Sequence, residues 1–128
     1  MGGYRDLKVW ARGMEVAAAV YEISKKMPQV ERYGLTSQML RSAASVPANI
    51  AEGYQRGTRK DYAHFVSIAR GSLAETETFL LLATRVGLLT PEQTQPILDQ
   101  VEELGRMLTR LRLALIRPER SHTPDPRP

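Results

Sequence analysis

The stretch Leu35–Gly57, LTSQMLRSAASVPANIAEGYQRG, is the part of the sequence that says most about the fold. It is rich in small residues and carries Pro47 inside a pattern that is otherwise helical. Small side chains let another helix approach closely, and the proline favours a kink because it removes one backbone donor. We therefore expect a helix over 35–52, followed by Gly53 as a C-terminal residue with positive φ. Its expected inward positions are Leu35, Met39, Ser42 or Ala43, Val46 and Ile50.

Polar residues share one side of this helix at spacings of three and four. They are Gln38, Ser42, Ser45 and Asn49, and Glu52 follows three residues later. Two interpretations are open. Asn49 and Glu52 could satisfy backbone groups freed by Pro47 and by the helix end, or they could belong to a functional site. The motif residues Gln38, Asn49, Glu52 and Gly53 are therefore kept as structural or functional candidates.

The first helix is expected over 6–26 and carries two apolar lines. We expect the first line to face the core, and the second indicates that the helix is covered on another side as well. The first line is Leu7, Trp10, Met14, Ala17 and Tyr21. The second line is Val9, Val16, Val20 and Ile23.

Two more helices follow the central stretch, and their ends have local signals. Thr58 and Thr90 are placed to cap them, Pro91 suits a first helical position, and Gly87 is expected to end the earlier one. Gly71, in the middle of that earlier helix, costs about 1 kcal/mol relative to alanine. We interpret it as a point of close approach by the second helix.

These features predict an all-α fold, an antiparallel up-down-up-down four-helix bundle. The chain has 128 residues, of which 42% are hydrophobic, and this suits a single domain. We expect the bundle to occupy residues 1–117. The segment 118–128 is rich in proline and polar residues and is expected to be disordered.

Several function classes lack support in the sequence. The chain has no cysteine, no apolar run of membrane-spanning length and no signal-peptide core near Met1, so we expect a cytoplasmic protein without a membrane partner. A di-iron site needs Glu-x-x-His on two helices, whereas His64 follows Asp61 at that spacing and His122, which follows Glu119, lies in the tail. With no nucleophile–base arrangement and no phosphate loop, we expect no enzyme activity, no cofactor and no metal. Water positioned by Asn49 and Glu52 is the remaining enzymatic hypothesis.

Basic residues give the strongest functional signal. The net charge is +4, and most of the 18 basic residues are arginine, which favours contacts to phosphate or carboxylate. In an antiparallel bundle, the turn near Arg56 and the C-terminus of the fourth helix would lie at the same end of the bundle. One interpretation is salt-dependent binding of RNA or DNA, and the other is stabilisation of helix ends by cations. The candidate nucleic-acid-binding residues are Arg41, Arg56, Arg59, Lys60, Arg70, Arg106 and Arg110.

Apolar residues left over after the core is assigned predict self-association, because a monomer of this size has few places to bury them. These residues are Val9, Val16, Val20, Leu40, Leu81, Leu82, Leu113 and Ile116.

Several motifs together resemble a known family. They are Leu7-x-x-Trp10, Pro28-x-x-Glu31-x-Tyr33-x-Leu35-x-x-Gln38, Asn49-Ile50-Ala51-Glu52-Gly53, Arg56 and Phe65-x-x-Ile68-Ala69-Arg70-Gly71-Ser72-Leu73-x-Glu75. The chain is similar to the four-helix-bundle proteins encoded in intervening sequences of bacterial 23S ribosomal RNA genes. The resemblance implies a homo-oligomer, a ring-like pentamer in members of this kind, whose molecular role is poorly defined. The leading hypothesis is a non-enzymatic scaffold that binds nucleic acid and could also bind a protein partner. The alternative is a protein-interaction scaffold with no nucleic-acid role.

Overall fold

The computed structural model describes residues 2–118, and these form four long helices and two short 3₁₀ helices. No strand occurs in this part of the chain. Of the expected tail over 118–128, all but Pro118 lies outside the described residues. The long helices are α1 (Lys8–Ser24), α2 (Leu35–Gln55), α3 (Arg59–Arg85) and α4 (Pro91–Ile116). The 3₁₀ helices are η1 (Tyr4–Asp6), before α1, and η2 (Gln29–Glu31), between α1 and α2.

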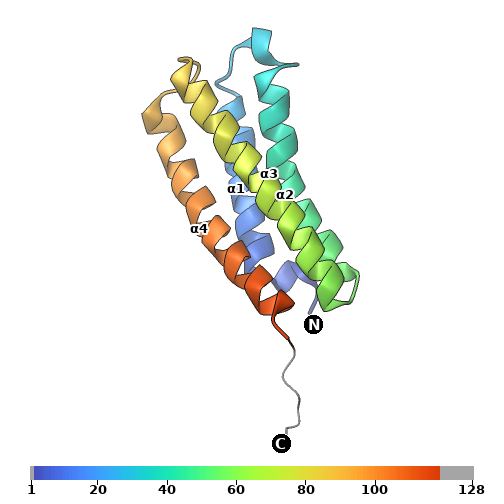
Figure 1. Cartoon of the computed structure of the whole chain (residues 1–128). Helices are drawn as coiled ribbons and strands as arrows, with labels where there is room; N and C mark the ends of the chain where they lie inside the picture. The colour runs from blue at the N-terminus through green and yellow to red at the C-terminus, as the bar shows by residue number, and fades with distance from the viewer. Residues whose placement is uncertain (1, 119–128) are drawn as a thin grey trace, which may run out of the picture.

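The four helices form an antiparallel bundle in which the chain direction alternates from each helix to the next (Figure 1). Each helix packs against its neighbours in the chain, and α4 returns to pack against α1. In the part of the chain that the structure describes, the diagonal pairs α1–α3 and α2–α4 bring no Cα atoms within 8 Å of one another. The all-α four-helix bundle predicted from the sequence is thus confirmed.

The side of α1 that faces the core differs from the prediction. Val16 and Val20 are fully buried, whereas Met14 is 46% exposed and Tyr21 is 50% exposed. The second apolar line therefore lies in the core, and the prediction that Val9, Val16 and Val20 stay exposed was wrong. The position of Gly13 explains why the second line is buried. Gly13 lies on the same side of α1 as the valines, and a Cβ atom there would lie 3.4 Å from Cβ of Pro47. Because α1 meets α2 so closely at this point, the valine line is turned inward.

The close contact between α2 and α3 also differs from the prediction. Gly53 does not cap α2 with positive φ; it lies inside the helix and is buried, and the positive φ in the following turn belongs to Gly57, at 88°. A Cβ atom on Gly53 would lie 2.6 Å from Cβ of Phe65. At Gly71 a Cβ atom would meet nothing within 4 Å. The helices therefore approach at Gly53, and the interpretation of Gly71 as the contact point was wrong.

The predicted helix caps are confirmed. The Thr58 hydroxyl accepts from the backbone N–H of Asp61 at 3.1 Å. The Thr90 hydroxyl accepts from the backbone N–H of Gln93 at 3.2 Å, and the Gln93 side chain accepts in return from Thr90 N–H at 2.9 Å. Gly87, with φ of 82°, follows the end of α3. These short-range contacts set where α3 and α4 begin.

Candidate functional site

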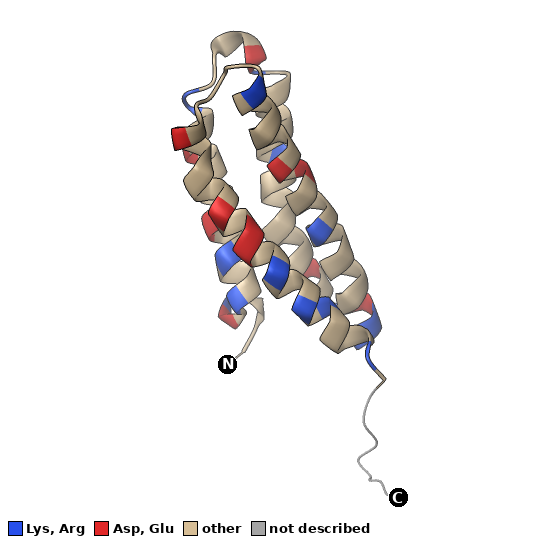
Figure 2. Ribbon diagram, turned by 60° about the vertical axis from the view of Figure 1, so that its left-hand side comes forward, with Lys and Arg blue, Asp and Glu red and all other residues tan. Residues whose placement is uncertain are grey.

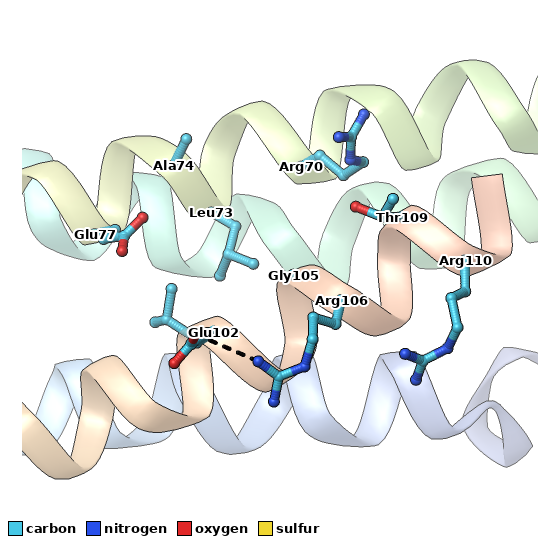
Figure 3. A pocket seen from close by; sticks show the side chains of 10 residues that line it. Arg70, Leu73, Ala74, Glu77, Glu102, Gly105, Arg106, Thr109 and Arg110 are labelled. Carbon is cyan, nitrogen blue, oxygen red and sulfur yellow. Dashed lines mark ion pairs between the residues drawn. The ribbon is translucent and has the colours of Figure 1, made fainter. Parts of the chain in front are cut away.

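An open groove of about 510 Å³ runs between α3 and α4. Its apolar lining includes Leu73, which is buried on α3, and Val101, which is buried on α4. Three arginines from the predicted set also line it: Arg70 from α3, and Arg106 and Arg110 from α4 (Figure 3). We call this surface the arginine groove. Packing of α3 against α4 brings these arginines together although they are far apart in the sequence.

The arginine groove carries a net positive charge, because three arginines line it against two carboxylates, Glu77 and Glu102. Arg106 pairs with Glu102 at 3.4 Å, and both side chains are more than half exposed. Among residues 2–118, Arg70 and Arg110 have no ion-pair partner. The charges therefore remain available to a ligand, since an exposed ion pair contributes only about 0–1 kcal/mol.

The three guanidinium groups do not converge on one point. Figure 3 shows Arg70 pointing away from α4, while Arg106 and Arg110 point away from α3. A site for one phosphate needs donors that meet around it. Cations spread along a groove suit an extended anion better.

Arg59 joins the α2–α3 turn to the end of α4. Its Nη2 donates to the carbonyl oxygen of Ala114 at 2.7 Å and to that of Arg117 at 3.5 Å. The Ala114 carbonyl belongs to the last turn of α4, where such groups have no partner within the helix, and Arg117 is the residue that follows the helix. Arg59 therefore caps α4, and the two basic regions lie at one end of the bundle as the antiparallel topology predicted.

The other predicted arginines have different surroundings. Arg56 donates from Nε to Glu52 at 3.0 Å, and its guanidinium lies 4.9 Å from the centre of the Phe65 ring. Lys60 is exposed beside Arg59. Arg41 is exposed on α2, diagonally across the bundle from α4, and it does not line the arginine groove. The structure thus brings together three of the seven candidates and ties two others into local contacts.

The polar side of α2 lies partly in a hydrogen-bonded seam against α3. Asn49 Nδ2 donates to the backbone oxygen and to the hydroxyl of Ser45, both at 2.8 Å. The Ser72 hydroxyl donates to that of Ser45 at 2.9 Å. Deeper in the bundle, the hydroxyl of Thr76 donates to that of Ser42 at 2.9 Å. Among the described residues, the Asn49 side chain therefore bonds only within α2, and it is linked to α3 through the Ser45 hydroxyl.

The remaining motif residues lie at the edges of this seam. Gln38 is exposed and makes no side-chain hydrogen bond within residues 2–118. Glu52 faces Arg56, and Gly53 leaves space for Phe65. The polar contacts of both side chains are local: Asn49 bonds to Ser45, and Glu52 bonds to Arg56.

Sequence reasoning missed one feature of the arginine groove and one ion pair outside it. One is Gly105, which lines the arginine groove where a side chain would partly fill it. A glycine in a helix interior costs about 1 kcal/mol, and this was the available signal. The other is the ion pair at 2.7 Å between Arg12 on α1 and Glu103 on α4. Its hydrogen bond raises the pKa of Arg12 and lowers the pKa of Glu103.

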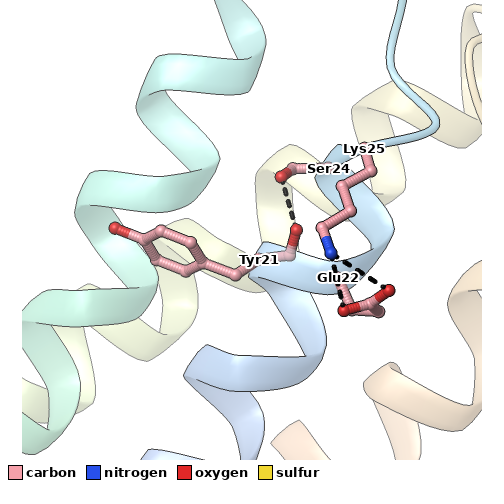
Figure 4. A network of polar contacts seen from close by, with 4 residues as sticks. All are labelled: Tyr21, Glu22, Ser24 and Lys25. Atoms are coloured by element: carbon pink, nitrogen blue, oxygen red, sulfur yellow. Dashed lines mark hydrogen bonds and ion pairs between the residues drawn. The ribbon is translucent and has the colours of Figure 1, made fainter.

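A second surface of interest is apolar and lies along the outside of α1. Four members of the line that was expected to face the core form it, Leu7, Trp10, Met14 and Tyr21, and we call them the α1 outer face. The fifth member, Ala17, is buried as expected, and Leu7 and Trp10 also pack against the core. Leu7 and Trp10 are partly buried, whereas Met14 and Tyr21 are about half exposed. Figure 4 shows the Tyr21 ring projecting from α1 away from the Glu22–Lys25 ion pair.

Part of the predicted surplus of apolar residues is also exposed. Leu81, Leu82, Leu113 and Ile116 are between 44% and 55% exposed, as predicted, while Leu40 is partly buried. Apolar surface thus remains on α1, α3 and α4.

Within residues 2–118, no group of three or more metal-binding side chains could hold an ion. No described helix is both long enough and apolar enough to cross a membrane.

Comparison with known proteins gives one family and one informative structure. The family model described as 23S rRNA-intervening sequence protein matches residues 5–110. A crystal structure from Bacteroides thetaiotaomicron, described as a protein with unknown function from the S23 ribosomal protein family, has 28% sequence identity and a TM-score of 0.74. The match covers 86% of this chain and 99% of that chain. No curated protein matches the chain.

Proposed function

The chain belongs to the family of 23S rRNA-intervening sequence proteins, and from this premise we propose that it is a non-enzymatic, homo-oligomeric scaffold that contacts nucleic acid through its arginine groove. The observation that carries the proposal is the set of three arginines along one groove, of which Arg70 and Arg110 have no ion-pair partner among residues 2–118. We further propose that the oligomer is a ring of five copies.

The charge distribution of α4 supports a polyanionic ligand. Its second half, residues 104–116, contains Arg106, Arg110 and Arg112 but no aspartate or glutamate. A duplex carries one negative charge per about 1.7 Å of its axis, so a row of cations can contact several phosphates at once. Because no aromatic side chain lines the groove, contacts to the backbone rather than stacked bases are expected.

The α1 outer face supports self-association. Met14 and Tyr21 present apolar surface on the side of α1 away from the core, and burying it against a second copy would remove it from water. In an oligomer, several arginine grooves would act on one nucleic-acid molecule. Multivalent binding of this kind raises the overall affinity although each subunit makes the same interactions as before.

A protein-interaction scaffold is the second candidate, and one observation favours it. Glu77 and Glu102 also line the groove, beside the apolar side chains of Leu73 and Val101. Carboxylates repel phosphate, whereas an apolar lining suits the apolar face of a partner helix. This candidate keeps the oligomer but assigns no ligand role to nucleic acid.

Binding of labelled RNA and DNA duplexes, measured by fluorescence anisotropy across a salt series, tests the proposal. We expect Arg70→Glu and Arg110→Glu each to weaken binding and to lower the slope of log affinity against log salt by about 1 for each phosphate that the variant no longer binds. Arg85→Glu is the matched control, because Arg85 is exposed at the opposite end of α3. Equal effects of all three variants would contradict a role for the groove. No binding by an intact oligomer would favour the protein-interaction scaffold.

A further inference from the structure

The exposed side of α4 carries two lines of side chains that repeat every seven residues. All eight are exposed to solvent. Residues seven apart lie on nearly the same side of a helix, and the two lines are offset by four residues, so together they form one continuous surface. We call this surface the α4 strip. The first line is Glu92, Asp99, Arg106 and Leu113, and the second is Pro96, Glu103, Arg110 and Arg117.

The sign of the charge changes halfway along the α4 strip. Residues 91–103 contain acidic but no basic side chains, and residues 104–117 contain basic but no acidic ones. Figure 2 shows this change along the helix that leads to the C-terminus. Such a distribution complements the helix dipole. It also makes the charges of the strip complementary to those of a second α4 strip that runs in the opposite direction.

We propose that the α4 strip packs against the α4 strip of a second copy in an antiparallel, two-fold symmetric contact. The two-fold axis of this contact is perpendicular to α4 and passes between Leu104 and Gly105. Each member of the first line then lies opposite a member of the second line, and every pair matches in character. The pairs are Glu92 with Arg117, Asp99 with Arg110, Arg106 with Glu103, and Leu113 with Pro96. Each pair occurs twice, because a two-fold contact uses the same surface on both copies.

The pair of Asp99 and Arg110 carries most of this proposal. Glu103 is already bound by Arg12 at 2.7 Å, and Arg106 by Glu102 at 3.4 Å. The pairs at the helix ends lie furthest from the axis, where packed helices that cross at about 20° diverge. Asp99 accepts only from Gln95 of its own helix, at 2.9 Å, and Arg110 has no ion-pair partner among residues 2–118.

The apolar pair adds burial to the charge pairing. Leu113 is 55% exposed in the single chain, and the contact would place it against Pro96 of the second copy. Exposed ion pairs contribute only about 0.2–1 kcal/mol each. The contact is therefore expected to form at high protein concentration and to weaken as salt is added.

This inference goes beyond the proposed function and does not depend on it. The contact uses α4, whereas the proposed ring uses the α1 outer face. If rings form, the contact joins two of them; if they do not, it joins two single chains. Arg106 and Arg110 also line the arginine groove, so nucleic acid and a second α4 strip compete for the same cations.

Charge reversal in two separate chains tests the contact directly. Asp99→Arg alone and Arg110→Asp alone each place like charges opposite one another in a pair of identical chains. An equal mixture of the two variants restores an opposite charge at both positions. The experiment is sedimentation velocity of the full chain over a concentration series, at low salt and without nucleic acid. Glu75→Arg, an exposed change of the same charge on α3, is the control.

The expected result is a doubling of mass with concentration for the unmodified chain and for the Glu75→Arg control. Each single variant is expected to associate at least about tenfold more weakly, because two attractive pairs become repulsive, and the mixture is expected to recover the doubled mass. If the unmodified chain does not double, or if the mixture stays as weak as its components, the inference is wrong. Asp99→Arg leaves the arginines of the groove in place. Nucleic-acid binding by this variant therefore tests the proposed function independently of the contact between α4 strips.

The absence of cysteine allows a second test, of orientation. A mixture of Pro96→Cys and Leu113→Cys chains is expected to form a disulfide between the two different variants under mild oxidation. A parallel contact would instead link identical variants, and that outcome would overturn the antiparallel arrangement.

Discussion

A Cβ atom on Gly53 of α2 would lie only 2.6 Å from Cβ of Phe65 on α3, and 3.3 Å from the backbone oxygen of Tyr62. The Phe65 Cβ is bonded directly to its backbone, so a change of rotamer cannot move it away. Gly53 therefore sets how closely the end of α2 can lie against the start of α3.

Replacing this glycine is expected to destabilise the bundle. Gly53→Ala forces the start of α3 to shift, and overpacking of this kind costs about 1–3 kcal/mol in the free energy of unfolding. Gly71→Ala is the control, because its Cβ atom meets nothing within 4 Å and alanine favours the helix by about 1 kcal/mol. Urea denaturation of both variants would measure the difference. A Gly53→Ala variant as stable as the unmodified chain would contradict the close contact.

Arg59 is expected to contribute to stability more than its neighbour does. Arg59→Ala removes the hydrogen bond at 2.7 Å to Ala114, and with it about 1 kcal/mol of unfolding free energy. Lys60→Ala removes the same charge from an exposed adjacent position. Thermal denaturation should show a lower melting temperature for Arg59→Ala alone. Equal melting temperatures would mean that Arg59 does not hold the end of α4.

The ion pair between Arg12 and Glu103 predicts a pH dependence. The Arg12 hydrogen bond lowers the pKa of Glu103, so the pair stabilises the fold above the pKa of an unfolded glutamate, about 4.3, and this contribution disappears as pH falls through the lower folded-state value. An NMR titration of the Glu103 carboxyl carbon would measure its pKa. In Arg12→Gln that pKa should rise, and an unchanged value would show that the pair does not form in solution.

The α1 outer face is expected to mediate assembly. Met14→Glu places a charge in a half-exposed apolar surface and should lower the mass of the oligomer while leaving the helical circular dichroism unchanged. Val30→Glu, at a position that is 85% exposed outside the long helices, is the control. If Met14→Glu assembles as the unmodified chain does, another surface must hold the oligomer together.

The features that sequence alone predicted well are those set by nearby residues. The caps at Thr58 and Thr90 depend on hydrogen bonds spanning three residues, and both form as predicted. The inward positions Met39, Val46 and Ile50 were also clear, because α2 has one apolar side, and all three are buried.

The features that sequence could not decide depend on which helices meet. Two apolar lines on α1 have equally good helical spacing, and only the contact of Gly13 with Pro47 shows which one enters the core. The arginine groove likewise depends on how α3 and α4 align, since this brings Arg70 beside Arg106. Composition identified these arginines as candidates but could not separate them from Arg59, which caps a helix.

Light scattering behind size exclusion, in low and high salt and with or without a mixed RNA and DNA pool, tests the central claim most directly. At protein concentrations too low for the contact between α4 strips, we expect an oligomer of about five chains in both salts that takes up nucleic acid only at low salt, because its contacts are to phosphate. A single-chain mass in both salts, with no nucleic acid bound at low salt, would contradict this claim.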